Sequence, residues 1–182
     1  MKDTGTVRMI FNMIRFHKPE EENGYLSNWY MSSFSLDDKT YCCVEQYMME
    51  RKAIMFANYD IAEQIMKTTD PQTMQKLGRT VTNFNQMEWD GKKQLIVYKA
   101  IIAKFEQNIE LMGRLLSTGT ATFVECSKSD KVWGIGLGMD DDISDMSKWN
   151  GQNLLGFALC EARAELMKRV ITQNANRKDI LS

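Results

Sequence analysis

Two charged side chains lie on a face where a helix would otherwise be apolar. The segment CCVEQYMMERKAIMF, residues 42–56, has the composition of a helix. At about 100° per residue, Glu45 and Lys52 fall within about 20° of each other, two turns apart. The arc around them is filled by apolar residues, namely Met48, Met49, Met55 and Phe56. We expect the opposite side of this helix, which carries Gln46, Glu50 and Arg51, to face solvent.

The chemistry available to this pair depends on burial. A lysine in apolar surroundings loses hydration, its pKa falls, and more of it is the nucleophilic free amine. Glu45 lies about 10 Å from Lys52 along the helix axis, which is too far for a close helical ion pair. Both side chains could nevertheless converge on a ligand between them. The alternative is structural: a buried salt bridge, or a lysine that snorkels past the methionines.

A second candidate is the glycine-rich segment SDKVWGIGLG, residues 129–138, which includes Asp130, Trp133 and Gly134. Glycines let a backbone approach a phosphate or a ribose closely, and an indole can stack on a base. The pattern is not a dinucleotide-binding fingerprint, because no strand–helix–strand unit precedes it. A tight structural turn is the alternative interpretation.

Three more residues are candidates for a binding role, a structural role or both. Arg79, in the segment LGR, could place a guanidinium group on a phosphate. Asn153 stands at the start of a predicted helix, where the N-terminus suits an anion, although a helix cap is the simpler interpretation. Trp89 is by default a core anchor.

Composition narrows the classes of function. The chain has 182 residues, of which 43% are hydrophobic and 26% charged, and its net charge is -1. This is the profile of one ordinary soluble domain, with no overall charge that would direct it to nucleic acid or to an anionic membrane. Its four cysteines form no CxxC pair and His17 is the single histidine, which argues against a zinc site and against histidine-based catalysis. We expect a cytoplasmic protein with no membrane span, no metal and no other cofactor.

Local patterns predict a predominantly helical α+β fold with a few short strands. Strands are predicted at residues 6–16 and 121–127, and a hairpin that turns at Asp37, Asp38 and Lys39 lies between residues 29 and 42. Helices are predicted at residues 43–57, at residues 60–70, at residues 71–77 after an Asp70 cap and before Gly78 as the stop, at residues 95–116, and at residues 151–173. The tail after residue 173 is expected to fray. We find no linker, and predict one domain over residues 1–182 with a core at about 24–170.

Taken together and in this order, eight segments resemble the NADAR family, also called YbiA-like. They are GYLSNWY, VEQYMMERKA, DPQTMQKLGR, the Trp89 indole, AKFEQNIEL, LLSTG, DKVWGIG and WNGQNLLG, within residues 24–167. The family's glutamate-to-lysine helix maps onto Glu45 and Lys52, and its acid before the Trp-Gly pair maps onto Asp130. The chain departs from the family at Gln46, where many members have histidine, and in the methionine-rich segment YMM.

The resemblance implies a compact, mainly helical α+β fold and hydrolysis of the N-glycosidic bond of a ribose-containing substrate. Members act on ribosylamino-pyrimidine intermediates of riboflavin synthesis, or remove ADP-ribose from guanine. VEQYMMERKA and WGIGLG are most similar to the ADP-ribose branch, which favours ADP-ribosylated guanine. On this basis our hypothesis is that Lys52 attacks C1 of the sugar to form a Schiff base that water hydrolyses, that Glu45 shuttles protons or holds a ribose hydroxyl, and that Asp130 orients the sugar or the water. The implied substrate-binding residues are Asn28, Arg79, Trp89, Trp133, Gly134 and Asn153.

Two other classes of function remain open at this point. A non-catalytic module that binds ADP-ribose or a nucleotide would keep the tryptophans and the glycine-rich loop, but it would not need an amine at Lys52. A structural interaction domain gains no support from these motifs. The expected partner is a small-molecule or nucleoside-linked ADP-ribose, or an ADP-ribosylated nucleic acid, and the sequence does not indicate an oligomeric state.

Overall fold

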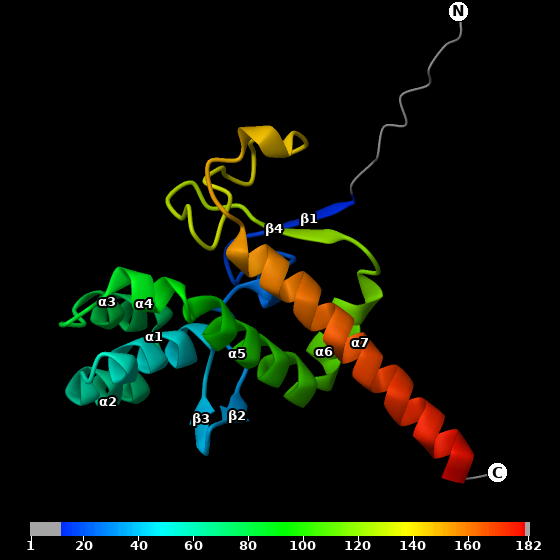
Figure 1. Ribbon diagram of the computed structural model, residues 1–182. Coiled ribbons are helices and arrows are strands. Elements are labelled where there is room, and N and C mark those ends of the chain that lie inside the picture. The colour runs from blue at the N-terminus through cyan, green and yellow to red at the C-terminus, as the bar shows by residue number, and fades with distance from the viewer. Residues whose placement is uncertain (1–11, 181–182) are drawn as a thin grey trace, which may run out of the picture.

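A computed structural model describes residues 12–180 of the chain, with side chains described as far as residue 176 (Figure 1). The strands in this part are β1 (Met13–Phe16), β2 (Phe34–Leu36), β3 (Lys39–Tyr41) and β4 (Thr122–Glu125). The helices are α1 (Val44–Met55), α2 (Tyr59–Lys67), α3 (Pro71–Arg79), α4 (Gln86–Asp90), α5 (Lys93–Gln107), α6 (Ile109–Ser117) and α7 (Leu154–Ile180). Short 3₁₀ turns occur at Gly24–Leu26 and Met146–Lys148. The prediction of a mainly helical α+β fold with few short strands is confirmed.

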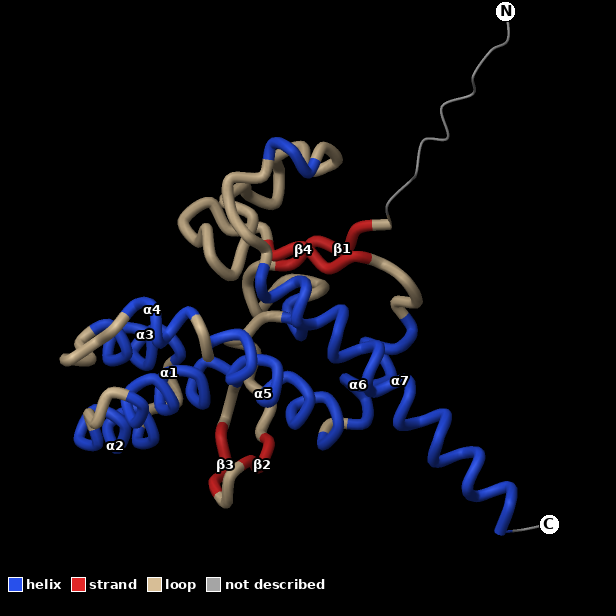
Figure 2. Tube along the Cα trace, in the orientation of Figure 1, coloured by secondary structure: helices blue, strands red, loops and turns tan. Residues whose placement is uncertain are grey.

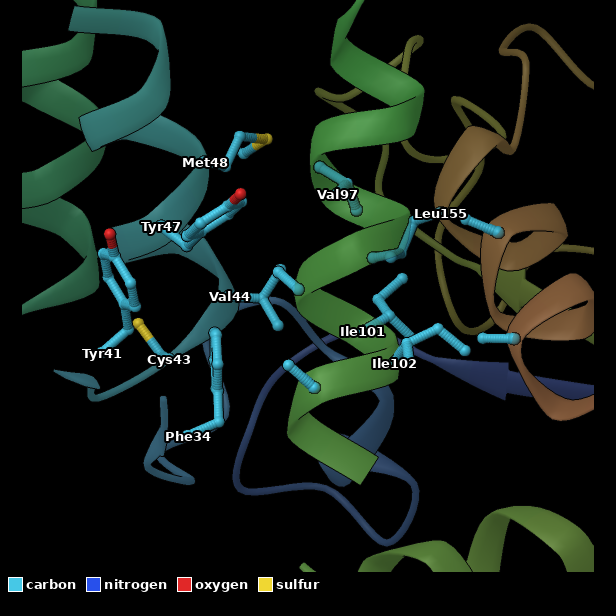
Figure 3. Close-up of a cluster of buried hydrophobic side chains, with 14 of the residues drawn as sticks. Phe34, Tyr41, Cys43, Val44, Tyr47, Met48, Val97, Ile101, Ile102 and Leu155 are labelled. Atoms are coloured by element: carbon cyan, nitrogen blue, oxygen red, sulfur yellow. The ribbon is translucent and has the colours of Figure 1, made fainter. Parts of the chain in front are cut away.

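Helix α5 forms the centre of the fold, with α1 packed on one side and α7 on the other. Val44 and Met48 of α1 face Val97 and Ile101 of α5, and Leu155 of α7 approaches from the far side (Figure 3). Removal of these side chains from water is the main favourable term that holds the three helices together. α1 therefore has a fixed position in the core, and so do the site residues on it.

The strands form two separate pairs, which Figure 2 shows in red. β1 and β4 are parallel, in a register that sets Met13 opposite Thr122 and Phe16 opposite Glu125, and α7 packs on β4. β2 and β3 form the predicted hairpin. Asp37 and Asp38 at its turn have φ angles of 52° and 62°, as a two-residue type I′ turn requires.

Several predicted boundaries differ from the structure. The predicted strand at residues 6–16 is observed only as Met13–Phe16, and residues 6–11 lie outside the described residues. The single helix predicted at residues 95–116 is two helices, because the backbone turns at Asn108. The Asn108 side-chain amide donates to the carbonyls of Ser33 and Lys104, at 3.1 and 2.7 Å, and so anchors the break to a distant segment. The tail predicted to fray instead continues α7 as far as Ile180.

The prediction that Gln46 and Glu50 face solvent is wrong. α1 contacts α2, α3 and α5, so both residues are buried. The Gln46 amide donates to the Ile65 carbonyl at 3.1 Å. The Glu50 carboxylate accepts hydrogen bonds from Lys39 Nζ at 2.7 Å and Arg51 Nε at 2.6 Å. Their burial is tolerated because each polar group has partners.

Candidate active site

Glu45 lies in the first turn of α1 and is 3% exposed. Its backbone N–H donates to the carbonyl of Asn28 at 3.0 Å. The pKa of the Glu45 carboxyl is raised to about 8, mainly by burial and also by the charge of Asp130, against the opposing effects of a hydrogen bond from the Trp29 side chain and of the charges of Arg79 and Lys52. Glu45 therefore carries a proton at neutral pH and is able to donate it.

The segment that meets Glu45 is the turn at residues 24–29. Lys104 of α5 is fully buried beneath it and donates from Nζ to the carbonyls of Tyr25 and Ser27, at 2.7 and 3.1 Å. These bonds hold Asn28 and Trp29 against the start of α1. Within residues 12–180, the buried oxygens Asn28 Oδ1 and Glu45 Oε1 have no hydrogen-bond partner. Buried acceptors without partners are costly, so this pair is suited to a ligand that brings donors such as hydroxyl groups.

Lys52 lies two turns after Glu45 and is half-buried. Its amine donates to the carbonyl of Gly78 at 2.8 Å. The same nitrogen lies 4.4 Å from the centre of the Phe84 ring and 5.9 Å from the Trp89 ring. Burial lowers the pKa of Lys52, the Arg79 charge lowers it further, and the Glu45 charge opposes the shift. The amine is thus more nucleophilic at neutral pH than an exposed lysine.

Helix α3 supports Lys52 and presents Arg79. The predicted cap is present: the Asp70 side chain accepts from the N–H groups of Gln72 and Thr73, and Pro71 occupies the first turn. Gly78 lies inside the helix instead of stopping it, and a Cβ at this position would lie 2.1 Å from Met49 Sδ. Gly78 is therefore a packing residue that lets α3 approach α1. Arg79, at the end of α3, is exposed and acts electrostatically on both Glu45 and Lys52.

Asp130 belongs to the long loop after β4. Its Oδ1 atom accepts from the backbone N–H groups of Val132 and Trp133, at 2.9 and 2.8 Å. Gly134 closes the turn, because a Cβ there would lie 2.9 Å from the carbonyl oxygens of both Asp130 and Glu125. Trp133 is half-buried and packs against the core. The glycine-rich segment is thus a tight turn, and it also brings the Asp130 carboxylate close enough to Glu45 to raise that residue's pKa.

The structure places the side chain of Asn153, which we predicted as a substrate-binding residue at a helix start, in the interior. Asn153 is 0% exposed. Its Oδ1 accepts from the N–H of Glu125 at 3.1 Å, and its Nδ2 donates to the carbonyl of Phe123 at 2.9 Å. Both ends of the amide are therefore used to tie the start of α7 to β4. Asn153 is a structural brace, in line with the simpler interpretation of a residue at a helix start.

The remaining site residues lie along one face of α1, from Glu45 in its first turn to Lys52 in its last turn. Charge interactions connect Glu45 with Lys52, Arg79 and Asp130, although these residues come from three separate segments. Trp89 is buried in α4 beside Lys52, as a core anchor that shields the amine. Two further side chains, neither of them predicted from the sequence, meet the site: Trp29 at Glu45 and Phe84 at Lys52. Trp29 directly follows Asn28 in the GYLSNWY segment, which was a usable signal, whereas Phe84 lies in an irregular loop that gave none.

The sequence model of the NADAR domain family matches residues 15–167 of this chain. This chain belongs to the NADAR family. Among curated relatives, N-glycosidase R617 of Acanthamoeba polyphaga mimivirus is 44% identical to this NADAR protein over 126 residues, which cover 69% of this chain and 74% of R617. The riboflavin biosynthesis protein VVA0006 of Vibrio vulnificus is 26% identical, over 85% of this chain and 39% of that protein.

A solved structure shows the same fold. The NMR structure of Escherichia coli YbiA matches this NADAR protein with a TM-score of 0.74 and 29% identity, covering 88% of each chain. The Escherichia coli protein carries the name N-glycosidase YbiA. It is 30% identical to this chain over 154 residues, which cover 85% of this chain and 88% of YbiA. The names of R617 and YbiA agree with the predicted class of enzyme, a hydrolase acting on N-glycosyl compounds. In the part of the chain that the structure describes, no helix has the length and apolar character needed to cross a bilayer.

Proposed function

We propose that this protein is an N-glycosidase that removes ADP-ribose from ADP-ribosylated guanine. The observation that carries the proposal is the pairing of two groups with opposite pKa shifts on one face of α1. Burial raises the pKa of Glu45 to about 8 and lowers that of Lys52. An acid that keeps its proton can protonate the leaving nitrogen, and an amine that tends to lose its proton can attack the sugar carbon. Together these two groups can cleave a C–N glycosidic bond. A module that only binds ADP-ribose would not need this pair.

In the first step, the Lys52 amine attacks the ribose C1′ while the bond from C1′ to the base breaks. The bonding electrons pass to the base nitrogen, which takes the proton of Glu45. The attacking nitrogen then returns a proton to the Glu45 carboxylate. Its electron pair expels the ring oxygen O4′, which takes that proton, so that a protonated imine joins Lys52 to the opened sugar.

In the second step, water adds to C1′ of the imine. Asp130 orients the water or the sugar, and Glu45 accepts the proton that the water loses. The hydroxyl proton of the adduct then passes to nitrogen, the bond from C1′ to Lys52 breaks, and the sugar aldehyde recloses to ribose. Glu45 and Lys52 return to their starting protonation states, and the net reaction consumes one water for each base released.

Binding roles follow from position. Arg79 is an exposed cation close to Glu45 and Lys52, which suits the diphosphate of ADP-ribose. The oxygens Asn28 Oδ1 and Glu45 Oε1 would accept hydrogen bonds from hydroxyl groups of the ribose. Trp133 and Gly134 would shape the wall of the site beside Asp130. ADP-ribosylated guanine is preferred because the segments VEQYMMERKA and WGIGLG resemble the ADP-ribose branch of the family.

A second candidate substrate is a ribosylamino-pyrimidine intermediate of riboflavin synthesis. The similarity to VVA0006, whose name places it in riboflavin biosynthesis, supports this candidate. The same acid and amine would cleave its N-glycosidic bond. The two candidates differ in the size of the leaving base and in the diphosphate that only ADP-ribose carries.

The test is cleavage of the N-glycosidic bond of each substrate, measured as free ADP-ribose from the guanine substrates and as free base from the pyrimidine, with Lys52→Arg as the matched inactive control. Guanosine carrying ADP-ribose, an ADP-ribosylated guanine within an oligonucleotide, and a ribosylamino-pyrimidine phosphate are compared at equal concentration. We expect turnover of at least one guanine substrate at more than about tenfold the kcat/KM of the pyrimidine. Turnover of the pyrimidine alone would reverse the choice of substrate. If the protein binds ADP-ribose but cleaves none of the three substrates, the remaining candidate function is a non-catalytic ADP-ribose-binding module.

A further inference from the structure

Phe84 is held rigidly in the loop between α3 and α4. The Asn58 side chain, just after α1, accepts from the N–H and hydroxyl of Thr82 at 3.0 and 2.8 Å, and donates to the Thr82 carbonyl at 3.0 Å. The Phe84 ring packs edge-on against Phe56, with 5.1 Å between ring centres. These contacts attach the loop to the end of the helix that carries Lys52.

The rigid ring nevertheless remains 38% exposed. Its centre lies 4.4 Å from Lys52 Nζ, so the exposed aromatic surface borders the amine that attacks the sugar in the proposed reaction. A solvated aromatic surface gives up favourable burial, whereas a planar ligand stacked on it would recover that burial. Neither the neighbouring Trp89, which is buried, nor Arg79, which is charged, offers such a surface.

We propose that Phe84 is a specificity-determining residue that stacks on the leaving nucleobase. This inference rests on the proposed N-glycosidase function and adds the contact that selects the base. Lys52 Nζ lies over one face of the Phe84 ring, so a base that stacks offset on the part of this face that the amine leaves open has its glycosidic nitrogen beside Lys52. The sugar C1′ attached to that nitrogen then lies within reach of the amine. A two-ring purine presents a larger π surface than a single pyrimidine ring and stacks more strongly, so this contact favours guanine substrates.

The experiment compares Phe84→Leu, which keeps an apolar side chain without a π surface, with Phe84→Trp, which enlarges that surface. Met87→Ala is the control, because Met87 is 84% exposed in the next helix. Binding of uncleaved ADP-ribosylated guanosine is measured in a Lys52→Arg background, and kcat and KM are measured in the Lys52 background. Guanosine monophosphate is a second probe of binding. Melting temperatures confirm that each variant is folded.

We expect Phe84→Leu to weaken binding of both probes by about five- to a hundredfold, the range that loss of one base–aromatic stack produces. Phe84→Trp should bind at least as tightly as the parent, and Met87→Ala should not change binding. Unchanged binding by folded Phe84→Leu would overturn the inference while leaving the N-glycosidase function intact. So would a change confined to the pH dependence of kcat, because the ring would then only shield Lys52. If the parent cleaves no N-glycoside, the proposed function fails, and the guanosine monophosphate measurement still decides whether Phe84 binds a base.

Discussion

The Lys52 amine donates a hydrogen bond to the carbonyl of Gly78 on the neighbouring helix, with 2.8 Å between Nζ and oxygen. This contact depends on the missing side chain of Gly78, because a Cβ at that position would lie 2.1 Å from Met49 Sδ. Met49 lies three residues before Lys52 on α1. The same close approach of α1 and α3 therefore both buries Met49 and fixes the direction of the Lys52 amine.

Gly78→Ala should destabilise the fold and reduce activity together. The added methyl group must displace the buried Met49, which costs about 1–3 kcal/mol in a packed core and lowers Tm by several degrees. The double variant Gly78→Ala/Met49→Ala should lose less stability than the sum of the two single losses, because the added methyl group no longer meets the Met49 side chain. Denaturant unfolding of the two single variants and the double variant measures this coupling. Strictly additive losses would show that Gly78 and Met49 do not share this contact.

Lys52→Arg should abolish covalent trapping and lower kcat by more than about a thousandfold, since removal of a nucleophile leaves only binding and electrostatic effects. Borohydride added during turnover should reduce the imine and leave the sugar moiety on a peptide containing Lys52. Mass spectrometry locates that peptide. The guanidinium group still has N–H donors for the Gly78 carbonyl, so the melting temperature should stay close to that of the parent. Near-parental turnover by Lys52→Arg would favour direct attack by water.

Glu45→Gln should lower kcat by about a hundred- to ten-thousandfold and change the pH profile. In the parent, Glu45 is protonated below its pKa of about 8 and loses that proton above it, so the rate should fall as pH rises through about 8. The variant cannot titrate at this position and should lack that decline. Profiles of kcat/KM, which report the pKa values of the free enzyme, for both proteins between about pH 6 and about 9.5 test this. A parental decline that persists in the variant would assign it to another group.

The Glu45 carboxyl should also make the free energy of unfolding depend on pH. Because its folded pKa of about 8 exceeds the ordinary 4.5, the folded state binds more protons than the unfolded state between these two values. The parent should therefore lose stability relative to Glu45→Gln as pH rises through this window. Differences in the free energy of unfolding at pH 5 and at about pH 8 measure the effect. A difference that does not vary with pH would mean that Glu45 is ionised in the folded protein.

Lys104 should affect the pH dependence of stability in the direction opposite to Glu45, and comparison of the parent with Lys104→Met shows this effect. Burial lowers the pKa of Lys104 to about 7 from the ordinary 10.5, so between these values the unfolded state binds more protons than the folded state. The parent should gain stability relative to Lys104→Met as pH rises from about 7 to about 9. Lys99→Met, an exposed position on the same helix, is the control and should show no such trend. The variant also leaves the carbonyls of Tyr25 and Ser27 without a donor, so KM should rise as the turn loosens.

The sequence alone determined the local features of this protein. The period of an α-helix is enough to place Glu45 and Lys52 on one arc of the helix observed at Val44–Met55. Short-range chemistry likewise predicted the hairpin turn at Asp37 and Asp38 and the cap formed by Asp70 and Pro71. The order of motifs indicated the NADAR family, which the match over residues 15–167 confirms. All of these depend on residues close together in the chain or on their order along it.

The tertiary structure decided which groups are buried and which meet. The helix pattern predicts Glu50 at the surface, yet other helices enclose α1, and Glu50 is buried and paired with Lys39 and Arg51. Asn108 breaks a continuous apolar repeat because its amide bonds to Ser33, 75 residues away. Phe84 and Asp130 reach the neighbourhood of α1 only through loops. The physical reason is the same in each case: burial and charge interactions depend on distances in space, and sequence periodicity does not encode those distances between remote segments.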